Sequence, residues 1–118
     1  MTNHRQTIDL PYRPEDLFEL ASDVGRYPDF IHWIQSLNVL SEQEDADGIR
    51  CRAEVRVGFK GFSETFITDV DAKRAERTID VKLVRGPFRK LANTWSFQPI
   101  PSGTRVDFFI TFEFRNFV

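Results

Sequence analysis

The residues that could support acid–base, nucleophilic or metal chemistry are few and widely separated in this 118-residue sequence. His4 lies near the N-terminus and His32 lies in a short aromatic segment, and neither has a Cys, Asp or Glu at metal-ligand spacing. No glycine-rich phosphate loop or nucleophile elbow is present. We therefore predict that the protein is not an enzyme and has no catalytic residue, no metal and no catalytic cofactor.

The remaining reactive side chains also have ordinary structural roles in this interpretation. Cys51 alternates with apolar residues, which favours a small buried hydrophobe over a reactive thiol. Asp69, Asp71 and Asp80 are expected at turns or on outward faces, where they make no acid–base pair.

The length fits one domain spanning residues 1–118, and the order of strands and helices predicted below makes it an α+β domain. Twelve phenylalanines, against two tyrosines and two tryptophans, suit either a wide apolar interior or a bulky filled core. The net charge of −2 gives no overall positive field for DNA. A single cysteine, with no signal peptide and no long apolar run, predicts a cytoplasmic protein, with peripheral contact at the inner membrane as an option.

Spacing in the first third of the chain predicts a strand and two short helices. Residues 7–10 read as a strand, and Pro14 is suited to the first turn of a helix that Gly25 would cap. Residues 27–34 look like a second short helix with an aromatic face.

After residue 35 the apolar period changes from 3.6 to 2, which predicts a meander of antiparallel strands. The expected strands are 36–44, 49–57, 62–70, 78–83, 91–97 and 106–114. With the first strand they make a curved sheet of six to seven strands. Its concave face needs side chains, a helix or a ligand to fill it, and we expect that a long C-terminal helix is missing or truncated.

The inner rows of these strands either line a tunnel or form a filled core. If they line a tunnel, a hydrophobic small molecule is the expected occupant, because such sites are mostly apolar and aromatic. The candidate ligand-binding residues are Phe30, Trp33, Val55, Val57, Phe62, Glu64, Phe66, Leu83, Pro87, Phe88, Asn93, Trp95 and Phe108.

Several segments give the chain a resemblance to the coenzyme-Q-binding START-like proteins, within the polyketide cyclase/START superfamily. That family overlaps the bacterial ribosome-association toxins and is more distantly similar to polyketide cyclases. The matching segments cover nearly the whole chain in order, and the third is fairly specific: Tyr27-Pro28-Asp29-Phe30 with Trp33, residues 57–62, Leu83-Val84-Arg85-Gly86-Pro87-Phe88-Arg89-Lys90-Leu91, Trp95-Ser96-Phe97 and Gly103-Thr104-Arg105-Val106.

The resemblance implies a helix-grip fold that holds ubiquinone, or a similar prenylated lipid, as a carried ligand in support of respiration. It also keeps two alternatives open: a ribosome-binding inhibitor of subunit association, and a polyketide cyclase or aromatase. In the helix-grip fold a long C-terminal helix forms one tunnel wall, and no function attached to that helix is carried over here. Several family members also have a cysteine where this chain has Ile34.

Three polar residues, Glu64, Thr68 and Asn93, are expected on the inner face. We hypothesise that Asn93 or Glu64 contacts the quinone head group, although a register shift would place Glu64 in solvent. The loop at 87–89, beside Arg85 and Lys90, is either a tunnel mouth that contacts lipid phosphates or a partner, or a bend with solvated charges.

Overall fold

The computed structural model describes residues 2–29, 31–59 and 61–115, and the side chains at 59 and 62 lie outside that description. The elements follow in the order β1 (Thr2–Leu10), α1 (Pro14–Ser22), the 3₁₀ helix η1 (Val24–Asp29), β2 (Ile34–Asp45), β3 (Gly48–Phe59), β4 (Phe62–Lys73), β5 (Thr78–Arg85), β6 (Phe88–Ile100) and β7 (Gly103–Phe114). The predicted α+β class and the seven-stranded sheet are confirmed.

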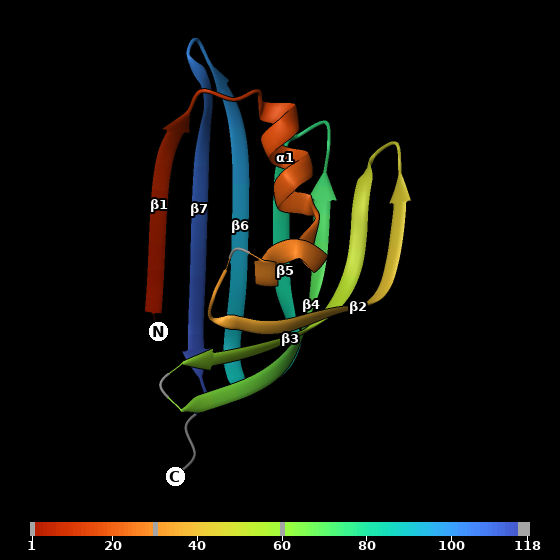
Figure 1. The fold of residues 1–118 in the computed structure, drawn as a ribbon, viewed down its shortest axis with the longest axis vertical. Coiled ribbons are helices and arrows are strands. Elements are labelled where there is room, and N and C mark those ends of the chain that lie inside the picture. The colour runs from red at the N-terminus through yellow and green to blue at the C-terminus, as the bar shows by residue number, and fades with distance from the viewer. Residues whose placement is uncertain (1, 30, 60, 116–118) are drawn as a thin grey trace.

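The seven strands form one antiparallel sheet in the order β1-β7-β6-β5-β4-β3-β2. From β2 to β7 each strand pairs with its neighbour in sequence, whereas β1 lies at the edge of the described sheet and pairs with β7, with Thr2 opposite Phe112 and Leu10 opposite Thr104. Figure 1 shows β2, β3 and β4 bending strongly while β1, β6 and β7 run nearly straight. The sheet is therefore curved, and α1 and η1 lie on its concave side.

The helix α1 begins as its sequence dictates and ends earlier than predicted. Pro14 occupies the first turn, followed by two acidic residues that favour the positive helix end. The last helical residue is Ser22, whose hydroxyl donates to the carbonyl oxygen of Phe18 at 2.7 Å. The expected cap at Gly25 is wrong, because Gly25 lies inside η1 and has no positive φ.

The second predicted helix, over residues 27–34, is wrong in extent. The helical segment is η1, which ends at Asp29, and Ile34 already begins β2 opposite Val57. Pro28 has no N–H to donate, which favours a short 3₁₀ turn over a regular helix.

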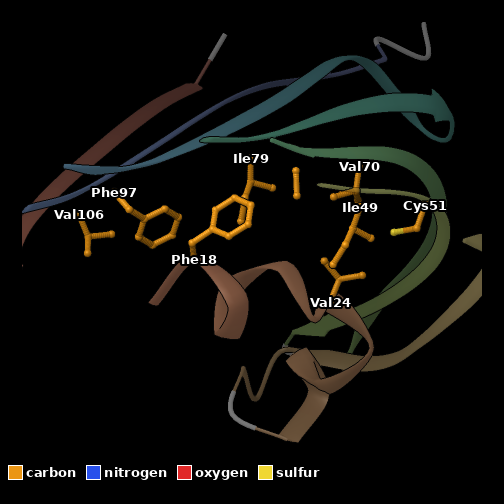
Figure 2. Packing of buried hydrophobic residues seen from close by; sticks show 9 residues of the cluster. Phe18, Val24, Ile49, Cys51, Val70, Ile79, Phe97 and Val106 are labelled. Atoms are coloured by element: carbon orange, nitrogen blue, oxygen red, sulfur yellow. The ribbon is translucent and has the colours of Figure 1, made fainter. Parts of the chain in front are cut away.

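Two apolar clusters fill the concave side. The larger lies beneath α1, where the ring of Phe18 packs edge-on against Phe97 with centroids 6.2 Å apart; Figure 2 shows this packing. The smaller cluster contains Ile34, Val55, Phe66 and Phe88. Within the described ranges, no helix has the length and apolar character needed to cross a bilayer.

Candidate functional site: an apolar cavity on the concave face

A cavity of about 130 Å³ lies on the concave side of the sheet, between the inner rows of β3–β7 and the segment that runs from η1 into β2. Strand pairing brings its residues into shared rows, because Val81, Asn93 and Ile110 are direct neighbours across three strands. The lining residues are Val24, Tyr27, Ile31, Trp33, Ile34, Leu37, Ala53, Val55, Phe66, Thr68, Val70, Val81, Leu91, Asn93, Trp95, Phe108 and Ile110.

Six of the candidate residues named from the sequence line this cavity: Trp33, Val55, Phe66, Asn93, Trp95 and Phe108. Phe88 belongs to the smaller apolar cluster, with Val57 and Leu83 packed against it, outside the cavity lining. Glu64 lies opposite Val57 on β4, nearer the end of the strand, and Pro87 lies in the β5–β6 turn. Phe30 and the side chain of Phe62 lie outside the described residues.

Sequence reasoning left out lining residues of two kinds. Val81, Leu91 and Ile110 continue the same alternating rows, so the period-2 pattern contained the signal that would have found them. Val24 and Ile31 come from η1 and the segment after it, where no simple period holds and no local signal marks them.

Few polar groups reach the cavity, and most of them already have partners. The amide nitrogen of Asn93 donates to the carbonyl oxygen of Phe109 at 2.8 Å, and its oxygen accepts from the indole N–H of Trp95 at 3.0 Å. The Tyr27 hydroxyl donates to the carbonyl oxygen of Ala21. Burial raises the pKa of Tyr27 well above its ordinary value, so this group stays neutral. Thr68, 3% exposed, is another polar lining residue.

The cavity therefore offers contact area, ring faces and a few hydrogen-bonding groups. Among its described lining residues there is no Asp, Glu, Lys, Arg or His. No group of three or more potential metal-ligating side chains occurs in the part of the chain that the structure describes. An arrangement of this kind suits binding of an apolar molecule.

A larger, open groove of about 680 Å³ lies over β2, β3, β4 and β5 and has a different character. Most of its lining side chains are charged, and Arg52 forms an ion pair with Asp69 at 2.8 Å. The Cys51 thiol at its edge is buried; burial, followed by the charges of Glu42 and Asp69, raises its pKa to about 11. We interpret this groove as a solvated charged surface.

This curved sheet, with helices and an apolar cavity on its concave side, defines the START-like, helix-grip class of small-molecule-binding folds. The chain belongs to the family described as polyketide cyclase / dehydrase and lipid transport, which it matches over residues 10–118. A START superfamily protein from Mycobacterium smegmatis has the same fold, with a TM-score of 0.80 and 24% identity over 98% of this chain and 79% of that one. The resemblance stated from the sequence is thus confirmed.

Two relatives are similar to this chain over nearly its whole length. The ribosome association toxin RatA of Rickettsia prowazekii is 31% identical over 121 residues, covering all of this chain and 80% of that protein. The mitochondrial coenzyme Q-binding protein coq10 of Schizosaccharomyces pombe is 36% identical over 116 residues, covering 96% of this chain and 70% of that protein.

Proposed function

We propose that this protein binds ubiquinone, or a similar prenylated lipid, in the concave cavity and carries or guards it for respiratory electron transport. The observation that carries the proposal is the cavity itself, which is apolar, lined by both tryptophans and free of charged side chains among its described residues. Its similarity to a protein named for coenzyme Q binding supports the same ligand. Ubiquinone is a cargo in this proposal, and the protein performs no reaction on it.

The size of the cavity limits which part of the ligand it can enclose. An apolar cavity of about 150 Å³ holds a benzene-sized ring, so the 130 Å³ here fits one ring or one isoprene unit. Burying a five-carbon isoprene unit gains roughly 3–4 kcal/mol, at about 0.8 per CH₂. A bilayer offers nearly the same gain, so polar contacts to the head group decide net extraction.

The head-group contact is proposed for Asn93, whose amide faces the cavity. Its two hydrogen bonds fix the orientation of the amide and leave one N–H and one acceptor lone pair for a ligand. The Thr68 hydroxyl is a second polar group among the lining residues that a head group could contact. Glu64, the other residue hypothesised for this role, is not among the cavity-lining residues. We propose a cytoplasmic location for this carrier, at the inner membrane when it exchanges lipid.

The test is mass spectrometry of organic extracts from the protein purified from a quinone-producing host. Wild-type protein should carry ubiquinone at close to one per chain. Val55→Trp, which places a large ring in the cavity, should carry little, whereas Ile8→Trp on the exposed face of β1 should carry the wild-type amount. A quinone-free extract from folded wild-type protein would refute the proposal.

A ribosome-directed function is the second candidate, because the chain is also similar to a protein named as a ribosome association toxin. In that case the protein should cosediment with ribosomal subunits and reduce their association. The cyclase alternative has less support, since acid–base catalysis of cyclisation would use a paired acid and base in the cavity and Tyr27 is the only ionisable lining residue described.

A further inference from the structure

Charge is unevenly distributed between the two ends of the sheet. The end that holds the turns at 11–13, 46–47, 74–77 and 101–102 is covered by α1, and there the arginines are paired with carboxylates. These ion pairs are Arg13–Asp16, Arg50–Asp45, Arg74–Glu19, Arg74–Glu44, Arg77–Glu15 and Arg105–Asp9.

The opposite end has exposed cations without such partners. The β3–β4 turn, the β5–β6 turn and the end of β7 meet there, and the amide N–H of Arg115 donates to the carbonyl oxygen of Pro87 at 2.9 Å. We call five cations at this end the basic rim, and none of them has a described carboxylate oxygen within 4.0 Å: Arg56, Arg85, Arg89, Lys90 and Arg115.

Few acidic groups offset this rim. Glu54, Glu64 and Glu113 are the described carboxylates of the same strand ends. Arg56 donates its hydrogen bonds to the neutral side chains of Gln35 and Ser63. The rim is therefore net positive on a chain whose net charge is −2, which orients the protein toward an anionic surface.

Apolar side chains are exposed near the rim, and one of them lies at the edge of the cavity. Trp33 is 51% exposed although it also lines the cavity, and its carbonyl oxygen accepts the amide N–H of Gly58 at the end of β3. Val84, at the irregular end of β5, is 42% exposed. An indole next to cations is suited to a membrane interface, where the ring lies among head groups and the cations meet phosphates.

We infer that the basic rim and Trp33 dock the protein on an anionic phospholipid bilayer, with the cavity edge toward the lipid. This inference rests on the proposed function, which requires a lipid to pass between membrane and cavity. RNA would also attract cations, but RNA binding would not by itself require an exposed indole at the edge of an apolar cavity. Each exposed cation near an anionic bilayer contributes roughly a fivefold factor in partitioning.

The experiment is cosedimentation of the protein with vesicles of phosphatidylcholine alone or with one quarter phosphatidylglycerol. Wild-type protein should bind only the anionic vesicles, and 1 M salt should release it. The double variant Arg89→Gln/Lys90→Gln should bind about 25-fold more weakly. The matched control Arg13→Gln/Arg105→Gln removes the same charge at the opposite end and should bind within about threefold of wild type.

Equal losses in the two double variants, or binding that ignores phosphatidylglycerol, would overturn the inference. Cosedimentation with ribosomal subunits that depends on Arg89 and Lys90, with no vesicle binding, would reassign the rim to RNA. Binding of a short-chain ubiquinone in buffer, measured on the same variants, separates the two proposals. Retained quinone binding without vesicle binding defeats the docking inference alone, and vesicle binding without quinone binding defeats the proposed function.

Discussion

Filling the cavity from β3 should abolish ligand binding while leaving the fold intact. Ala53 is 1% exposed, lines the cavity and lies opposite Thr68 on β4. Ala53→Leu adds three carbon atoms, and at roughly 30 Å³ each, the volume share of a water molecule, they occupy about 90 Å³. That is most of the 130 Å³ available. Because the new atoms enter empty space, we expect the free energy of unfolding to change by less than about 2 kcal/mol.

The effect on binding should be much larger than the effect on stability. Leucine at this position displaces one isoprene-sized group, whose burial is worth roughly 3–4 kcal/mol. The affinity should therefore fall by about 100- to 1,000-fold.

The two tryptophans of the chain provide the assay, because Trp33 and Trp95 both line the cavity. A quinone within the cavity should quench their fluorescence, so titration with ubiquinone bearing two isoprene units measures the affinity directly. Ala75→Leu, an identical change in the exposed β4–β5 turn, is the control and should bind like wild type. Folded Ala53→Leu protein that binds within threefold of wild type would refute the assignment of this cavity as the ligand site.

Three further perturbations test the fold and its interior. Gly48→Ala should lower the free energy of unfolding, measured by urea titration, by more than about 3 kcal/mol. The reason is that φ is 154° and the added Cβ would lie 1.8 Å from a carbonyl oxygen of β4. The control Gly61→Ala has open space around it and should cost only about 1–2 kcal/mol. Asn93→Ala should cost about 1–3 kcal/mol by leaving the Trp95 indole N–H unpaired, and a loss below 0.5 would contradict this hydrogen bond's importance. Cys51, with a pKa of about 11, should be alkylated at pH 8 at least ~100-fold more slowly than free cysteine, because only the thiolate reacts. The rate should increase as the pH rises. A rate equal to that of free cysteine would show that the thiol is accessible and that its pKa is not raised.

The strands after residue 35 were predictable because their signal is local. In β3 the apolar and charged residues alternate between Ile49 and Val57, so the sequence alone identifies which residues face inward. The strand β1 was only partly predicted, as residues 7–10 of Thr2–Leu10. Its residues are exposed along almost their whole length, so no alternation marks them, and only pairing with β7 holds them extended.

The site was less predictable than the sheet, because alternation gives a face but not a position along it. Trp95 and Leu83 are both inner-face residues, yet Trp95 lines the cavity and Leu83 packs in the cluster beside it. The rows that meet the cavity depend on the curvature of the sheet and on where η1 lies. Val24 lines the cavity because of where η1 lies, and no periodic pattern in the sequence predicts that position.

The pairing of β1 with β7 has a consequence for how the chain is made. Among the described strands β1 is synthesised first, and its partner in the described sheet is β7, which follows about a hundred residues later. At roughly 5–20 residues per second, that partner is synthesised some 5–20 s afterwards. Throughout that interval the growing meander can form hairpin by hairpin, whereas the N-terminal strand has an open ladder of amides and carbonyls. Folding should therefore depend on protection of β1 until β7 has been made, and a pause in translation just before β7 should cause more misassembly than a pause between two earlier strands of the meander.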